Sequence, residues 1–185
     1  MRKFAKLMLK LLGWDVGDNA PEGVDKCVIV VGPHTSNWDF IIGRLAFMSY
    51  GVKASILIKK DLFFFPLGPI LKSIGGVPID RKSNNNFTDQ AKAIFDKNET
   101  LYMVFTPEGT RSYNPKWKKG FYYVAKKVNV PIYIAFMDYK NKKGGFLELY
   151  EPTDNVEEDI KYIKSKLAQF EGKFPENGIR RVEDE

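Results

Sequence analysis

Short runs of apolar residues alternate along this chain with segments whose apolar residues recur at helical spacing. The runs predict strands because they are short, continuous and bounded by turn residues. They cover residues 27–31, 54–59, 77–79, 101–105, 131–138 and 145–150. Helices are predicted over residues 2–12, 39–50, 87–96, 121–129 and 156–170. This alternation predicts an α/β fold with a mostly parallel, mixed sheet covered by helices.

The length of 185 residues suits a single domain with a substantial core. We expect an amphipathic helix within residues 1–16, one domain over residues 17–171, and a loose, charged tail over residues 172–185. No apolar run approaches the roughly 20 residues of a membrane-spanning helix. Lysines interrupt the apolar residues of the N-terminus, which argues against a signal peptide. The sequence therefore predicts a cytoplasmic protein that at most lies on a membrane.

A formal net charge of +6 favours an acidic partner, such as nucleic acid, anionic lipid, a substrate phosphate or an acidic acyl carrier protein. The lysines around Trp117 are weak evidence for nucleic acid, because no helix-turn-helix or RNP-like pattern accompanies them. We expect no nucleic-acid partner. Cys27, the single cysteine, cannot form an internal disulfide. The chain has no cysteine or histidine cluster for a metal, so no metal is expected.

Two apolar segments leave alternatives open. The predicted helix over residues 2–12 carries a stripe of Phe4, Leu7, Met8, Leu11 and Leu12 opposite Arg2, Lys3, Lys6 and Lys10. Such a helix either lies on an anionic membrane surface or docks on the domain through the same stripe. Residues 62–71 are apolar and interrupted by two prolines. They form either a surface for acyl chains or part of the core.

The only histidine, His34, lies in a polar turn between the predicted strand 27–31 and the predicted helix 39–50. In open α/β sheets, ligands bind beyond the carboxyl ends of the strands. If Asp39 lies in the first helical turn, its carboxylate can bond one nitrogen of the imidazole. The other nitrogen can then take a proton from a hydroxyl group. The competing interpretation is a capping box, in which Ser36 and Asp39 only begin the helix.

A second polar stretch follows the predicted strand 101–105 and reads Thr-Pro-Glu-Gly-Thr-Arg-Ser. Gly109 permits close approach of the backbone to a ligand, Thr110 adds a hydroxyl, and Arg111 supplies a planar cationic group. These residue types suit a phosphate ester. Glu108 would either accept a hydrogen bond from a glycerol hydroxyl or hold Arg111 in position.

The pattern H-x-x-x-x-D from His34 to Asp39, followed by F-x-P-E-G-T-R-S over residues 105–112, resembles the glycerophospholipid acyltransferase family, typified by lysophosphatidic acid acyltransferases. A further family block, G-x-x-x-x-R, is matched by residues 76–81. Another, Val-Pro-Ile at residues 130–132, matches in part, because Ile134 stands where the family usually has a proline. Together the four blocks cover roughly residues 28–137.

This resemblance implies a glycerolphosphate-acyltransferase-like fold and an O-acyltransferase of phospholipid biosynthesis. The acyl group would pass from a thioester, on coenzyme A or acyl carrier protein, to a hydroxyl of a lysophospholipid, foremost 1-acylglycerol 3-phosphate. His34 would be the base and Asp39 its orienting group. The resemblance also implies that Arg81, with residues 108–111, holds the acceptor phosphate. No cofactor besides the acyl donor and no metal is implied.

Other functions remain possible on the sequence. The acceptor could be glycerol 3-phosphate or a lyso-aminolipid, whose carboxylate would take the place of the phosphate. The protein could instead be an ester hydrolase in which His34 activates water. A non-catalytic membrane-binding or nucleic-acid-binding protein is a third class, but it gives no reason for the His34 and Asp39 pair to accompany the Glu-Gly-Thr-Arg sequence.

Overall fold

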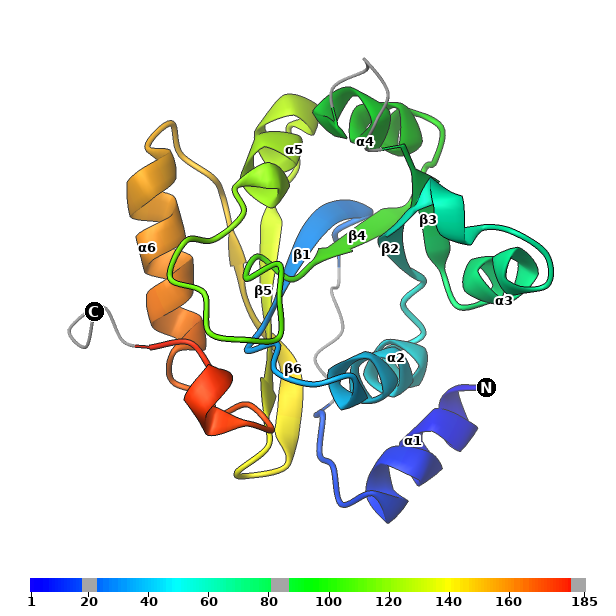
Figure 1. Cartoon of the computed structure of the whole chain (residues 1–185), viewed down its shortest axis with the longest axis vertical. Coiled ribbons are helices and arrows are strands. Elements are labelled where there is room, and N and C mark those ends of the chain that lie inside the picture. The colour runs from blue at the N-terminus through cyan, green and yellow to red at the C-terminus, as the bar shows by residue number, and fades with distance from the viewer. Residues whose placement is uncertain (18–22, 81–86, 181–185) are drawn as a thin grey trace.

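The computed structural model describes residues 1–17, 23–80 and 87–180. Within these residues the centre is a six-stranded sheet in the order β3-β2-β4-β1-β5-β6, whose edge strand β6 pairs antiparallel with β5 (Figure 1). All the other pairings are parallel. The strands are β1 Lys26–Gly32, β2 Ala54–Lys59, β3 Gly76–Ile79, β4 Leu101–Phe105, β5 Ile132–Asp138 and β6 Lys143–Tyr150. The predicted α/β fold with a mostly parallel, mixed sheet is confirmed.

Six α-helices and two short 3₁₀ helices accompany the sheet in the described part of the chain. They are α1 Arg2–Leu11, α2 Trp38–Tyr50, α3 Leu67–Ser73, α4 Phe87–Asp96, α5 Gly120–Val128 and α6 Val156–Leu167, with η1 Lys60–Leu62 and η2 Pro175–Asn177. Every predicted strand and helix is present, with ends that differ by a few residues. Helix α3 is an addition that the prolines concealed. Its Pro69 lies in the first helical turn, where a backbone N–H has no intrahelical partner.

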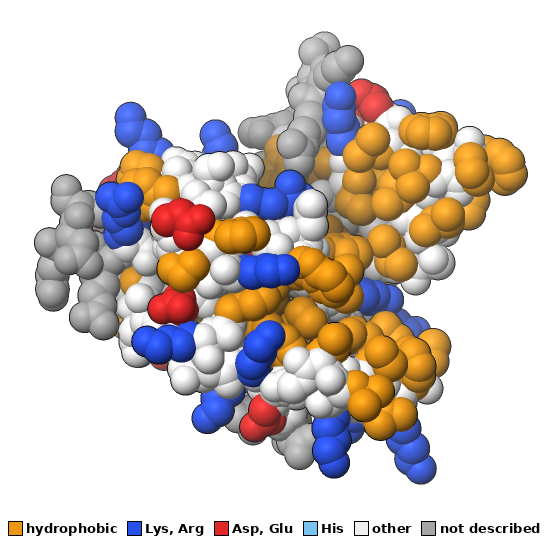
Figure 2. All heavy atoms as spheres, turned by 60° about the horizontal axis from the view of Figure 1, so that its bottom comes forward, with side chains coloured by type: hydrophobic (Ala, Val, Ile, Leu, Met, Phe, Trp, Pro, Cys, Tyr) orange, Lys and Arg blue, Asp and Glu red, His pale blue; other side chains and the backbone are white. Residues whose placement is uncertain are grey.

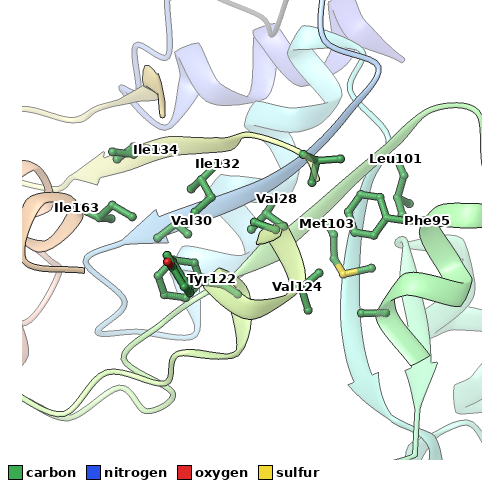
Figure 3. Packing of buried hydrophobic residues seen from close by; sticks show 14 of the residues in the cluster. Val28, Val30, Phe95, Leu101, Met103, Tyr122, Val124, Ile132, Ile134 and Ile163 are labelled. Carbon is green, nitrogen blue, oxygen red and sulfur yellow. The ribbon is translucent and has the colours of Figure 1, made fainter. Parts of the chain in front are cut away.

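Strand β1 fills the core on both faces of the sheet. Val28 and Val30 pack with side chains of α4, α5 and α6 (Figure 3). Cys27 and Ile29 pack on the opposite face with side chains of α1 and α2. Because successive side chains of a strand point to opposite faces, a continuous apolar run is what a doubly covered strand requires.

Helix α1 docks on α2, but not through the predicted stripe. Ala5 and Leu9 are the buried residues of α1, and the Arg2 guanidinium donates a hydrogen bond to the carbonyl of Tyr50 in α2. Phe4 and Leu7 of the stripe are 59% and 55% exposed. The stripe therefore remains on the surface while a neighbouring face of the helix makes the contact. The docking alternative placed this contact on the stripe and is wrong on that point, whereas contact of the stripe with a membrane stays a prediction.

The predicted loose tail is wrong for residues 172–180. The amide of Phe174 donates a hydrogen bond of 3.2 Å to Thr35 Oγ1 in the turn after β1. Ile179 packs against the core, and the Arg180 guanidinium lies 4.0 Å from the ring centroid of Tyr113. This segment therefore covers the turn after β1 and reaches the loop after β4. Residues 181–185 lie outside the described residues.

Residues 62–71 lie on the surface. Phe64, Phe65 and Ile70 are 58%, 87% and 55% exposed, so this segment is not a buried part of the core. Neither α3 nor any other helix in the described ranges is long and apolar enough to cross a membrane.

The close contact between Gly172 and the turn after β1 gives a stability prediction. A Cβ at Gly172 would lie 2.6 Å from the side chain of Thr35, which is itself buried. Gly172→Ala should therefore lower the free energy of unfolding by about 1–3 kcal/mol, as overpacking usually does. Urea denaturation followed by circular dichroism measures the change.

Gly43→Ala in α2 is the matched control, because nothing lies within 4 Å of the Cβ that it adds. Alanine is favoured over glycine inside a helix, so this variant should keep its stability or gain up to about 1 kcal/mol. Equal stability of the two variants would show that Gly172 is not held against Thr35.

Candidate active site

The two polar stretches of the sequence meet at one edge of the sheet. Strands β1 and β4 are parallel neighbours, with Val30 opposite Phe105 near their carboxyl ends. The turn after β1 carries His34, and the loop after β4 carries residues 108–111. Because neighbouring parallel strands end at the same edge, the topology brings the turn and the loop together.

His34 and Asp39 make the contact that their spacing predicts. His34 Nδ1 lies 3.0 Å from Asp39 Oδ2, where the turn passes into α2. The same oxygen accepts hydrogen bonds of 2.8 Å from the amides of Thr35 and Ser36. One carboxylate thus binds two amides of the turn and orients the imidazole. The N-cap of α2 is Asn37 and makes no side-chain cap bond, so of the predicted capping box only the bond from the Ser36 amide to Asp39 is present. The contact at Nδ1 leaves Nε2 of His34 for a substrate.

Tyr139 is a partner of Asp39 that the sequence does not reveal. Its hydroxyl donates a hydrogen bond of 2.7 Å to Asp39 Oδ1. Tyr139 follows β5, its amide donates to the carbonyl of Glu171, and its ring meets Trp14 edge to face at 4.9 Å between centroids. These contacts hold the hydroxyl in place from three segments that are far apart in the sequence.

The hydrogen bonds keep Asp39 ionised although it is buried. Burial by itself would raise the pKa of the Asp39 carboxyl, but hydrogen bonds from His34, Tyr139 and the backbone outweigh it, and the pKa lies below its usual value. Burial and the bond to Asp39 raise the pKa of the Tyr139 phenol, so this group keeps its proton. Asp39 is therefore a permanent anion beside the imidazole at neutral pH.

Glu108 lies behind the histidine turn. It is 2% exposed, and its Oε1 accepts a hydrogen bond of 2.8 Å from the amide of His34. Burial and the nearby charge of Asp39 raise the pKa of Glu108 to about 8, although the bond from His34 opposes this rise. The expected partners of Glu108 were a substrate hydroxyl or Arg111. The structure joins Glu108 to the backbone of the turn, where it fixes the position of His34, and a bond to a substrate hydroxyl stays a prediction.

The rest of the loop faces the solvent side of the site. Gly109 has a φ of +69°, a conformation that favours glycine, and both Thr110 and Arg111 are exposed. The side chain of Lys118 lies against Gly109, since a Cβ there would be 3.0 Å from Lys118 Cγ. Arg81, the remaining predicted phosphate ligand, lies outside the described residues.

One cleft of about 1150 Å³ joins these groups. His34, Asp39 and residues 109–111 line it, together with Arg44, Lys118 and Lys119, which the sequence does not single out for this site. Its apolar walls are formed by Val31, Phe40, Ile41, Phe47, Ile56, Leu57, Phe87, Val104, Phe105, Phe121 and Met137. A base, cationic groups and apolar walls in one cleft suit a substrate that combines a hydroxyl, a negative charge and a hydrocarbon chain.

The single cysteine takes no part in this site. Cys27 is fully buried in β1, and burial raises the pKa of its thiol to about 12. A thiol in this state is a poor nucleophile, because the thiolate is the reactive form. Among the described residues, no group of three or more histidine, cysteine, aspartate or glutamate side chains could hold a metal ion.

Comparison with solved structures gives a match to the crystal structure of the 1-acyl-sn-glycerophosphate (LPA) acyltransferase PlsC from Thermotoga maritima. The TM-score is 0.63 at 20% sequence identity, and the match covers 91% of this chain and 75% of that one. This likeness shows a common fold. A comparison with curated proteins found no match.

A comparison with protein families matches the model named Acyltransferase over residues 16–137, more than half of the chain. The matched region contains β1 to β4 and all but the last residue of β5, and with them the histidine turn and the Glu-Gly-Thr-Arg loop. The resemblance that these two motifs suggested is therefore confirmed, and the chain belongs to the Acyltransferase family.

Proposed function

We propose that this acyltransferase transfers a fatty acyl group from a thioester to a free hydroxyl of a lysophospholipid, most favourably 1-acylglycerol 3-phosphate, in phospholipid biosynthesis. The observation that carries the proposal is the pairing of His34 with Asp39 in a cleft that also has cationic groups and apolar walls. A lysophospholipid has a hydroxyl for the base, a phosphate for the cations and an acyl chain for the walls.

In the proposed reaction, Nε2 of His34 removes the proton from the acceptor hydroxyl as the hydroxyl oxygen attacks the thioester carbonyl. The tetrahedral intermediate then expels the thiolate, which takes the proton from the imidazolium. Asp39 stabilises the imidazolium through Nδ1, 3.0 Å from its carboxylate. A base of this kind contributes about 10²–10⁴-fold to the rate. Both oxygens of Asp39 are already engaged, so the carboxylate is oriented before the substrate binds.

For the acceptor phosphate we propose Gly109, Thr110 and Arg111 as ligands, with Arg81 as a further one. Arg111 matches phosphate oxygens in two parallel hydrogen bonds, and Gly109 lets the backbone approach closely. Lys118 lines the same cleft and adds positive charge. We assign no phosphate contact to Glu108, since its carboxyl is buried against the amide of His34.

We further propose that the enzyme works on the cytoplasmic face of a membrane, where its acceptor resides, and takes the acyl group from coenzyme A or acyl carrier protein. Both donors are negatively charged, as are the headgroups of an anionic membrane, and the chain carries a formal charge of +6. Phe4, Leu7 and Leu11 of α1 are exposed and support contact with the bilayer.

The central prediction concerns His34→Ala. Purified protein is offered labelled 1-acylglycerol 3-phosphate with acyl-coenzyme A or with acyl carrier protein. We expect kcat to fall by about 10²–10⁴-fold in the variant. The fold should be kept, because the backbone amide that bonds Glu108 is still present. Turnover that survives the substitution would remove His34 from the mechanism. Release of free fatty acid without any acylated acceptor would instead identify a hydrolase.

Arg111→Ala tests the phosphate site. A lost charge-assisted hydrogen bond should raise the KM for the acceptor by roughly 10–100-fold, with a smaller effect on kcat. Lys116→Ala is the matched control, because Lys116 is an exposed cation of the same segment that does not line the cleft. If both variants shift the acceptor KM equally, the effect comes from general charge and not from Arg111.

Tyr139→Phe tests the positioning of Asp39. Without the phenol, the pKa of Asp39 should rise towards or above its usual value, because a hydrogen bond to the ionised form is lost. The carboxylate then takes up a proton at a higher pH, so the acid limb of the kcat profile should move to higher pH. At neutral pH we expect kcat to fall by about tenfold.

Tyr133→Phe, on strand β5, is the control for this effect, since the Tyr133 ring packs on Phe146 away from Asp39. It should leave the profile in place. An unchanged acid limb in Tyr139→Phe would show that the phenol does not act through Asp39.

A further inference from the structure

The segment between β2 and β3 presents apolar side chains to solvent. We call residues 60–73, which contain η1 and α3, the elbow. Phe65 is 87% exposed and Phe64 is 58% exposed, at the point where the elbow turns. Monomeric soluble proteins seldom display two adjacent phenylalanines in this way.

The elbow is folded tightly upon itself, which keeps these rings outside. The amide of Gly68 donates a hydrogen bond of 2.6 Å to the carbonyl of Phe64. A Cβ at Gly68 would lie 2.8 Å from the carbonyl oxygen of Phe63, and one at Gly76 would lie 2.6 Å from that of Leu71. These close backbone contacts fix the shape of the turn, and Phe65 lies on its outer side. Its exposure is therefore a result of the local fold.

The elbow shares one side of the molecule with α1 and α2. Figure 2 shows apolar side chains gathered over α3 and, across a hollow, over α1 and α2. Leu11 of α1 and Ile41 of α2 are 70% and 44% exposed. Helices α1 and α2 pack together, and Arg44 of α2 approaches Gly75, just beyond the elbow. The elbow, α1 and α2 thus lie on one face of the molecule. Apolar side chains project from this face at two places, the elbow and α1.

The charge of this face identifies its partner. Residues 1–13 carry Arg2, Lys3, Lys6 and Lys10 and no acidic residue, and residues 59–73 carry Lys59, Lys60 and Lys72 with Asp61. A second copy of the chain would bring cations against cations. Anionic lipid headgroups complement them, while the acyl region below accepts the aromatic rings.

The face is also continuous with the candidate active site. Phe40 and Ile41 are 40% and 44% exposed on α2, and both line the cleft that contains His34. A lipid that leaves a bilayer in contact with α2 therefore reaches the cleft along apolar side chains. This step of the argument rests on the proposed lipid acceptor, whereas the exposure and the charge do not.

We propose that the elbow is a second membrane-contact site, which inserts Phe64 and Phe65 into an anionic bilayer beside α1. The elbow and α1 hold the enzyme at two points, with α2 and the entrance to the cleft between them at the lipid surface. A single amphipathic helix would allow the domain to swing, and a second contact fixes its orientation.

Sedimentation of the full chain with vesicles tests this surface without any turnover. Vesicles of phosphatidylcholine alone are compared with vesicles of phosphatidylcholine and phosphatidylglycerol. We expect binding to the mixed vesicles, about tenfold weaker for Phe65→Ser and weaker again for Phe64→Ser with Phe65→Ser. Tyr123→Ser is the matched control, since Tyr123 is a 48% exposed aromatic residue on α5, in the layer across the sheet. It should bind as the unsubstituted chain does.

Partitioning that is the same in all variants, or no binding of the unsubstituted chain to mixed vesicles, would overturn the proposal. So would a dimer in gel filtration that Phe65→Ser converts to a monomer, because a second copy would then cover the elbow. Activity on a short-chain, water-soluble acceptor should be unaffected by Phe65→Ser. Loss of vesicle binding with that activity intact separates the membrane surface from the catalytic proposal.

Discussion

Parallel pairing of β1 with β4 and β5 is the constraint on which the site depends. Val30 of β1 lies opposite Phe105 of β4 and Ile134 of β5, so three strands end at the same edge of the sheet. The turn after β1 supplies the histidine, the loop after β4 supplies Glu108, and the end of β5 leads to Tyr139. A shift in this register would separate groups that are bonded at distances below 3 Å.

Two buried carboxyl groups, those of Asp39 and Glu108, then fix the position of His34. The Asp39 carboxylate makes hydrogen bonds with the imidazole of His34, two backbone amides and the phenol of Tyr139, and these bonds favour its ionised form. Glu108 accepts the amide of His34, and its burial favours the protonated form up to a pH of about 8. The pair illustrates how environment separates two carboxyl groups. Asp39 has enough donors to offset its burial, whereas Glu108 accepts a hydrogen bond from the amide of His34 and has the charge of Asp39 nearby.

Apolar side chains of α1 and the elbow are exposed because other residues make the contacts of these two segments. Ala5 and Leu9 attach α1 to the domain, which leaves Phe4, Leu7 and Leu11 outside. The elbow likewise forms backbone hydrogen bonds within itself and leaves the side chains of Phe64 and Phe65 exposed. Apolar area exposed at two places on one basic face is unfavourable in water, and the proposed contact with a bilayer would compensate for it. The cleft that contains His34 is lined in part by α2.

The sequence by itself determined what depends on local pattern. Within the described residues, the alternation of apolar runs and helical stripes identified every strand and all the α-helices except α3, because burial of a strand or a helix face leaves a short-range period. The contact between His34 and Asp39 was predictable because it is also local: the two residues are five positions apart and are joined by one turn. The order of the family motifs was visible in the chain alone.

Tertiary structure decided the contacts between distant segments. Tyr139 lies 100 residues from Asp39, and Glu108 lies 74 residues from His34, so only the strand order brings them together. The amphipathic pattern of α1 could not show that Ala5 and Leu9 would form its contact, because a helix with apolar residues on two adjoining faces can bury either. The charged composition of residues 172–180 concealed their packing. The contacts are made by Gly172, the amide of Phe174 and the side chains of Ile179 and Arg180, whose partners are far away in the sequence. Hydrophobic periodicity indicates which elements form, whereas the fold decides which of their faces are buried and against what.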